Sequence, residues 1–216
     1  MAQHSDSYQD SEVCRGYNES MTLVLLESLR PNPQESQTFF VDQPEKIIQC
    51  ETAGEVDELL TEVEELIQNG YTAFGFLTYE AGYAFLPNLP EPPRLTLPCA
   101  WFALSKDFQK ELPPNFIPEA KQPAISDLRL NQDLKSYEEA LTRIKNYIWR
   151  GDTYQVNYTL RYNGKHDGSP RDLYSWLRMQ QRVNYAAMIE TPEWALLSFS
   201  PELFFRKNGQ DISMSE

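Results

Sequence analysis

The chain has 216 residues, of which 41% are hydrophobic and 12% aromatic, and its formal net charge is −13. A chain of this length buries about 70% of its unfolded surface, so it can form one large or two small domains without a stabilising metal or disulfide. The negative charge argues against nucleic acid and anionic membranes as partners, although a few local cations can still bind a small anion because charge is screened over about 10 Å.

The cysteines, the histidines and the N-terminus indicate a cytoplasmic protein. Cys14, Cys50 and Cys99 are far apart and follow no metal-ligand spacing, which predicts reduced thiols. With two histidines in the chain, a histidine-rich metal site is excluded. No apolar run approaches the roughly 18 residues of a membrane span, and residues 1–20 lack the hydrophobic centre of a signal peptide. We therefore expect a cytoplasmic protein in which residues 1–20 form a disordered polar tail.

Residues 21–123 are predicted to form an N-terminal lobe in which strands predominate. Short apolar or β-branched stretches between loops are typical of strands. Such stretches occupy Thr22–Leu26, Thr38–Val41, Lys46–Cys50, Tyr71–Tyr79 and Cys99–Leu104. Between them, Glu55–Asn69 is a predicted helix, because its apolar residues recur on one helical face and Gly70 follows where a left-handed residue commonly ends a helix. Pro87–Pro98 and Leu112–Pro123 are expected to be proline-rich loops.

Residues 124–216 are predicted to form the start of a second domain. Ser136–Arg150 is a helix in which Ser136 and Glu139 form a capping box, Thr153–Tyr162 is a strand, and a further helix begins at Ser169. Four strands follow, at Asn184–Glu190, Trp194–Phe199, Leu203–Arg206 and Asp211–Ser215, with the hairpin dipeptide Asn208-Gly209 between the last two. The elements do not alternate strictly between strand and helix. The sequence therefore predicts an α+β fold with largely antiparallel sheets and flanking helices.

Generic catalytic motifs for nucleotide binding, nucleophilic hydrolysis and zinc binding do not occur in the sequence. Three stretches instead place unusual polar residues among predicted strands, namely Gly151–Thr159 (GDTYQVNYT), Phe76–Tyr83 (FLTYEAGY) and Ser198–Phe205 (SFSPELFF). Strand alternation would put Gln155 and Asn157 on one face, and Glu202 lies between two apolar strands.

Together these stretches resemble the chorismate-utilising enzymes, which include the aminodeoxychorismate, anthranilate, isochorismate and salicylate synthases. The Gly-Asp-x-Tyr-Gln-Val-Asn run after a helix favours the family of aminodeoxychorismate synthase component I. The resemblance extends from about Met21 to Ser215 and implies the N-terminal part of that fold, in which residues 124–216 are the incomplete start of the chorismate-binding domain. It also implies conversion of chorismate and ammonia to 4-amino-4-deoxychorismate, on the route to p-aminobenzoate and folate, with ammonia supplied by a glutamine amidotransferase subunit or domain.

Three polar residues are candidates for the active site. Glu202 matches a glutamate that acts as a general acid or base, and burial between apolar strands would raise the pKa of its carboxyl group. Spacing alone leaves open that Glu202 only pairs with a strand neighbour or a lysine. Gln155 and Asn157 either line the substrate pocket or satisfy the backbone groups of a nearby loop.

A second site is implied near the start of the chain. Leu26, Glu27 and Ser28 match a Leu-Leu-Glu-Ser strand that contacts tryptophan, which is a feedback inhibitor in anthranilate synthases and a structural ligand in some aminodeoxychorismate synthases. Tyr185 retains the aromatic residue of a second pocket segment, Asn-Pro-x-Pro-(Tyr/Phe), but both prolines are missing. The alternative is a strand end at which Glu27 and Ser28 cap nearby backbone groups.

The family's Pro-(Ile/Met)-Lys-Gly-Thr motif would begin at about Glu216, and the segments that supply the Mg²⁺ ligands and the substrate-binding cations would follow. We therefore expect Mg²⁺ to be a cofactor of the full-length enzyme with no ligands in this chain, and we expect the fragment by itself to be inactive. Three alternatives remain: a fragment of anthranilate synthase component I, a stand-alone lobe that binds an aromatic amino acid, and an inert product of truncation.

Overall fold

The computed structural model describes residues 22–29, 37–86, 96–181 and 183–215, so the predicted tail at 1–20 and most of the Pro87–Pro98 loop lie outside the described residues. The chain divides into two compact units, unit 1 (Met1–Phe116 and Gln180–Glu216) and unit 2 (Ile117–Met179). Every described strand pair is antiparallel, which confirms the predicted α+β class. Within these ranges no helix is both long and apolar enough to cross a membrane.

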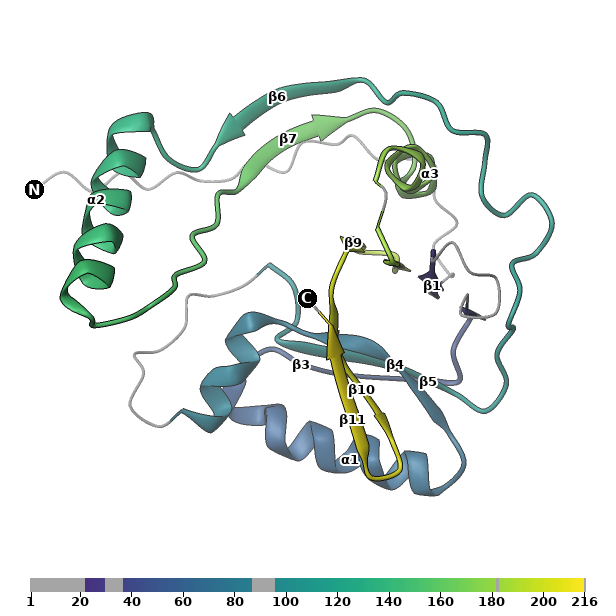
Figure 1. Ribbon diagram of the computed structural model, residues 1–216. Coiled ribbons are helices and arrows are strands. Elements are labelled where there is room, and N and C mark those ends of the chain that lie inside the picture. The colour runs from purple at the N-terminus through teal and green to yellow at the C-terminus, as the bar shows by residue number, and fades with distance from the viewer. Residues whose placement is uncertain (1–21, 30–36, 87–95, 182, 216) are drawn as a thin grey trace, which may run out of the picture. The chain divides into compact units, whose positions relative to one another are not determined.

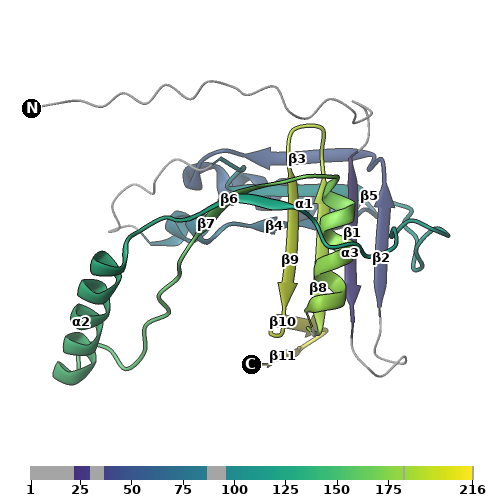
Figure 2. The ribbon, with the colours of Figure 1, turned by 90° about the horizontal axis from the view of Figure 1, so that it is seen from above.

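A four-stranded sheet in unit 1 joins the two ends of the chain (Figure 2). Its order is β2-β1-β8-β9, with bounds β1 Leu23–Ser28, β2 Thr38–Asp42, β8 Tyr185–Glu190 and β9 Ala195–Ser200. The central strand β1 is apolar because both of its faces are covered, and Leu23, Val24 and Leu25 are fully buried. The predicted division into domains at residue 123 stays a prediction. The sheet contains strands from both sides of that position, because β8 pairs with β1.

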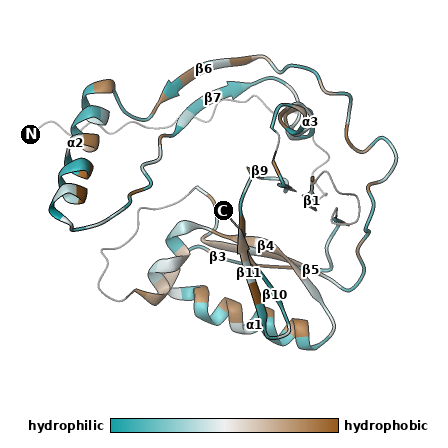
Figure 3. Cartoon of the chain, in the orientation of Figure 1, coloured by the Kyte–Doolittle hydropathy of each residue, from teal (hydrophilic) through white to brown (hydrophobic). Residues whose placement is uncertain are grey.

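A second sheet, with order β3-β5-β4, packs between the first sheet and a helix (Figure 1). The strands are β3 Lys46–Cys50, β4 Thr72–Leu77 and β5 Ala100–Ser105, and the helix is α1, Val56–Gln68. Figure 3 shows hydrophobic and hydrophilic residues alternating along α1, as the predicted periodicity requires. Its buried residues Val56, Leu59 and Val63 cover one face of the sheet, where Cys50 and Cys99 are free and buried.

The opposite face of the second sheet forms a core with the first sheet. Phe74, Trp101 and Ala103 pack there against Val24, Val41 and Ile189. The Trp101 ring lies against Phe76, with ring centroids 6.4 Å apart, and meets the edge of Trp194 at 5.6 Å. Alternation along β5 therefore serves two cores, with Ala100 facing α1 and Trp101 facing the first sheet.

The last two strands form the predicted hairpin. Strand β10 (Leu203–Asn208) pairs with β11 (Asp211–Ser215), and Asn208 lies opposite Asp211. Gly209 has a φ of 59°, a left-handed conformation that glycine adopts without a steric penalty. The Asn-Gly signal was therefore sufficient to place this turn.

Unit 2 contains the two-stranded sheet of β6 (Ile125–Leu130) and β7 (Tyr162–His166), together with α2 (Leu134–Arg150) and α3 (Pro170–Gln180). Two predictions in it are wrong. The helix cap of α2 is Asp133, whose carboxylate accepts the Ser136 N–H at 2.8 Å, so Ser136 and Glu139 do not form the capping box. The strand expected at Thr153–Tyr162 begins only at Tyr162, because most of this stretch has no partner strand within the unit.

The start of α3 gives a pH-dependent prediction. Ser169 donates its N–H and hydroxyl to the Asp172 carboxylate at 2.9 and 2.7 Å, and its oxygen accepts the Asp172 N–H at 3.1 Å. The Ser169 hydroxyl and then its N–H lower the pKa of the Asp172 carboxyl group. A carboxyl group with a lowered native pKa stabilises the fold fully above its unfolded pKa, about 3.9, and loses this contribution as pH falls through the native value.

We therefore expect Asp172→Asn to destabilise the protein at pH 7, and we expect the difference from wild type to shrink as pH falls below about 4. Urea unfolding between pH 3 and 7, followed by circular dichroism, measures this difference. A difference that stays constant over the whole range would show that the Asp172 charge contributes nothing.

Candidate functional site

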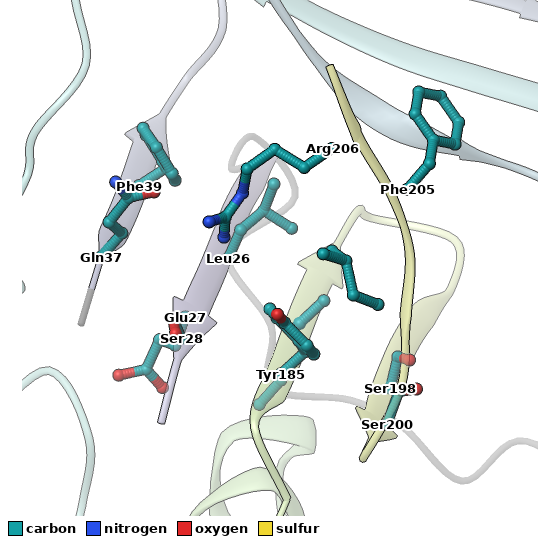
Figure 4. Close-up of a pocket in the computed structure, with 13 residues that line it drawn as sticks. Leu26, Glu27, Ser28, Gln37, Phe39, Tyr185, Ser198, Ser200, Phe205 and Arg206 are labelled. Carbon is teal, nitrogen blue, oxygen red and sulfur yellow. The ribbon is translucent and has the colours of Figure 1, made fainter. Parts of the chain in front are cut away.

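A cavity of about 440 Å³ lies in unit 1, where one face of the β2-β1-β8-β9 sheet is flanked by β10 (Figure 4). This is within the size range of small-molecule sites. The residues that line it are Leu26, Glu27, Ser28, Gln37, Phe39, Tyr185, Ala186, Ala187, Ser198, Ser200, Leu203, Phe205 and Arg206. We refer to it as the β1–β8 pocket.

The strand register places most of these side chains in two rows on one face of the sheet. One row crosses all four strands as Phe39, Leu26, Ala187 and Ser198. The next row contains Ser28, Tyr185 and Ser200, and it continues to Gln37, whose carbonyl accepts the Ser28 N–H at 2.7 Å. A third row on the same face, with Val24, Val41, Ile189 and Leu196, packs into the core with the second sheet. The pocket therefore lies on the part of this sheet face that extends beyond the core.

The pocket combines an apolar floor with hydroxyl groups. Phe39 connects the floor to the core, since its ring lies 6.2 Å from Phe74 and 5.8 Å from Phe108. Ala187 is small and leaves space at the centre of its row. Ser28, Ser198, Ser200 and Tyr185 supply hydroxyl groups that can donate or accept hydrogen bonds. Such a site suits a ligand with an apolar ring and a polar end.

Two charged residues are among those that line the pocket. Arg206 of β10 is the only cation, and Glu27 of β1 the only carboxylate, among the described residues that line it. Glu27 is buried, whereas Arg206 is exposed. Figure 4 shows the Arg206 guanidinium group extending toward β1.

The structure brings together the four residues predicted to bind a tryptophan-like ligand, because Leu26, Glu27, Ser28 and Tyr185 all line the β1–β8 pocket. Sequence reasoning did not assign Phe39, Ser198, Ser200 or Arg206 to it. The two serines alternate in the Ser-Phe-Ser-Pro-Glu run and could have been placed on one strand face. Their position opposite β8 depends on a register that the sequence does not show. The binding role itself stays a prediction.

Glu202 lies in the turn between β9 and β10 and is exposed in the described structure. The Ser200 hydroxyl accepts the Glu202 N–H at 3.2 Å and donates to its carbonyl at 3.1 Å, and Asn184 Nδ2 donates to the Pro201 carbonyl at 3.2 Å. The burial expected from the flanking strands is therefore not observed, because the chain reverses at Pro201 and the carboxylate belongs to the turn. The catalytic role of Glu202 stays a prediction.

Gln155 and Asn157 lie in unit 2 and are exposed. Their segment is not a strand, and Gln155 Nε2 donates to Asn157 Oδ1 at 3.4 Å. The amides are thus adjacent, as expected, but through a local contact and not through strand alternation. Their role in a substrate pocket also stays a prediction.

The residues that the structure describes contain no group of three or more His, Cys, Asp or Glu side chains that could hold a metal ion. Mg²⁺ prefers several oxygen ligands in octahedral geometry, and the described carboxylates do not offer such a set. The expected Mg²⁺ therefore has no fitting site among them.

This chain is similar to one protein family and to several known proteins. The family model of chorismate binding enzymes matches residues 31–215. Aminodeoxychorismate synthase component 1 of Escherichia coli is 25% identical over 202 residues, which cover 82% of this chain and 44% of that protein. The protein of the same name from Bacillus subtilis is 35% identical over 74 residues, or 34% of this chain and 16% of that protein.

An anthranilate synthase component 1 of Haloarcula marismortui is also similar, with 30% identity over 99 residues that cover 42% of this chain and 20% of that protein. The chain spans less than half the length of each of these curated relatives. Because the family model covers most of the sequence, the chain belongs to the family of chorismate binding enzymes.

Proposed function

We propose that this chain is the N-terminal part of an enzyme that converts chorismate and ammonia to 4-amino-4-deoxychorismate. The match of the family model to residues 31–215 carries the proposal. Two of the relatives above are named aminodeoxychorismate synthase component 1, and the Gly-Asp-Thr-Tyr-Gln-Val-Asn run favours the same branch. A glutamine amidotransferase subunit or domain is the proposed source of ammonia, and Mg²⁺ the proposed cofactor of the whole enzyme.

The proposed reaction forms a C–N bond to the chorismate ring and breaks a C–O bond, so the departing hydroxyl group must leave as water. Glu202 is the proposed group that transfers the proton. Its backbone is held in the turn by Ser200, which leaves the carboxylate free to meet a substrate. Gln155 and Asn157 are proposed to donate hydrogen bonds to chorismate. A dianion also needs several cations, and in unit 1 the β1–β8 pocket offers one, Arg206.

The β1–β8 pocket is proposed to bind a tryptophan-like amino acid rather than chorismate. The supporting observation is that Leu26, Glu27 and Ser28 line one cavity with Tyr185, which lies more than 150 residues later in the sequence. Its apolar floor suits an aromatic ring, and its hydroxyl groups suit the polar end of an amino acid. The missing prolines next to Tyr185 do not prevent this residue from reaching the cavity.

A chimera tests the proposed reaction. We expect the E. coli relative to keep aminodeoxychorismate formation when its aligned segment is replaced by this chain, and we expect the 216-residue chain alone to form no product from chorismate, ammonia and Mg²⁺. Chromatography separates aminodeoxychorismate from anthranilate, and circular dichroism confirms that the chimera is folded. Product formation by the chain alone, or a folded chimera without activity, would contradict the proposal.

A further inference from the structure

We infer that Arg206 binds the carboxylate of the ligand in the β1–β8 pocket and thereby selects an amino acid over an amine with the same ring. This inference rests on the proposed amino-acid pocket and adds a residue from β10, a strand that the tryptophan-related motifs do not include. Arg206 lies 180 residues after Leu26 in the sequence, yet both line the same cavity.

The guanidinium group is available for a ligand. Among the described residues, Arg206 forms no ion pair. A guanidinium group carries five N–H donors in a planar arrangement that matches the two oxygens of a carboxylate. Its exposed position in the free protein means that a ligand does not have to displace a protein carboxylate.

The other lining residues favour a zwitterion over a dianion. Leu26, Phe39 and Phe205 offer apolar surface for a ring. The hydroxyl groups of Ser198 and Ser200 can accept hydrogen bonds from an ammonium group. The second negative charge of a dicarboxylate such as chorismate would find no second cation among the described lining residues. One cation therefore complements an aromatic α-amino acid, which carries a single carboxylate.

Lys207 provides a matched control. It follows Arg206 in β10 and pairs with Ile212 of β11, it has the same charge, and it is absent from the pocket lining. Successive strand residues project to opposite faces, so Lys207→Gln removes the same charge from the hairpin without touching the pocket. If affinity is lost in Arg206→Gln but not in Lys207→Gln, the effect is local to the pocket and does not come from the change in net charge.

Isothermal titration calorimetry of the 216-residue chain with L-tryptophan, tryptamine and indole-3-propionate tests the inference. Loss of the charge-assisted hydrogen bonds between a guanidinium group and a ligand carboxylate weakens binding by roughly ten- to a hundredfold. We expect Arg206→Gln to weaken the binding of tryptophan and indole-3-propionate by this factor and to leave the affinity for tryptamine unchanged. We expect Lys207→Gln to bind all three ligands as wild type does, and Arg206→Lys to recover part of the carboxylate binding.

The outcomes separate the two proposals. If wild type binds tryptophan and Arg206→Gln binds it equally well, the role of Arg206 is wrong and the amino-acid pocket stands. If wild type shows no heat with tryptophan at millimolar concentration, the pocket and the role of Arg206 both fail. If chorismate binds more tightly than tryptophan and depends on Arg206, the preference for a zwitterion is wrong. Thermal melting of each variant confirms that exposed Arg206 and Lys207 are dispensable for folding.

Discussion

Replacing Glu202 by glutamine in the active chimera is expected to lower kcat by roughly 10²- to 10⁴-fold, the usual contribution of a positioned general acid or base. Glutamine keeps the shape of the side chain and its hydrogen-bonding capacity but cannot transfer a proton at neutral pH. The KM for chorismate should change much less, because the proposed role lies in the transition state and not in binding. Steady-state kinetics with chorismate and ammonia measure both constants.

The structure predicts that this substitution leaves folding intact. The contacts at Glu202 that hold the turn involve its backbone N–H and carbonyl group, both bonded to Ser200, and its side chain is exposed. Surface substitutions of this kind change the free energy of unfolding by about 0.5 kcal/mol or less. Glu193→Gln is the matched control, since Glu193 is an exposed residue of the preceding turn. An equal effect of the two substitutions on kcat would remove Glu202 from the catalytic mechanism.

Replacing Gly75 by alanine is expected to lower the free energy of unfolding by about 3 kcal/mol, which is the upper end of the usual range for overpacked cores. Gly75 lies in β4 opposite Phe102 of β5. A Cβ atom there would overlap the Trp101 carbonyl oxygen and lie 2.8 Å from Phe102 Cδ1 and 2.9 Å from Phe102 Cα. Two of these three atoms belong to the backbone of the neighbouring strand, so the clash cannot be relieved by rotating a side chain. The strands have to separate next to the buried Trp101.

Gly82 offers the control for this prediction. It lies in the 3₁₀ helix η2 (Tyr79–Phe85), and a Cβ atom on it would meet nothing within 4 Å. Urea unfolding should therefore show a much lower midpoint for Gly75→Ala than for wild type, with Gly82→Ala close to wild type. Similar midpoints for the two variants would mean that β4 and β5 adapt to a side chain at position 75 without cost.

Local patterns identified most elements correctly. Apolar residues with helical spacing located α1, which ends at Gln68, two residues before left-handed Gly70, and Asn208-Gly209 located the β10–β11 turn. Both signals act within one element, where the spacing of side chains alone decides the conformation. The cap of α2 was misplaced because Asp133 and Ser136 are both good caps, and the sequence does not show which of them begins the helix.

The partners of the strands were not predictable in the same way. Residues 153–161 have the composition of a strand, yet they pair with nothing in unit 2, so propensity without a partner did not produce a sheet. Apolar residues also recur on one face of α2, yet within that unit Ile148 is exposed and Ala140 is the buried residue of the helix. Burial depends on which surface meets the stripe, and the periodicity specifies only that a stripe exists.

The sequence by itself determined the α+β class, the principal helices and strands, and the family motifs that point to chorismate chemistry. It also identified Leu26, Glu27, Ser28 and Tyr185 as one group through resemblance. Only the tertiary structure showed that β8 pairs with β1, that Ser198 and Ser200 continue the same rows, and that Arg206 reaches the pocket. The physical reason is that hydrogen bonding between distant strands fixes a register, and a shift of one residue would turn every one of these side chains to the other face of the sheet.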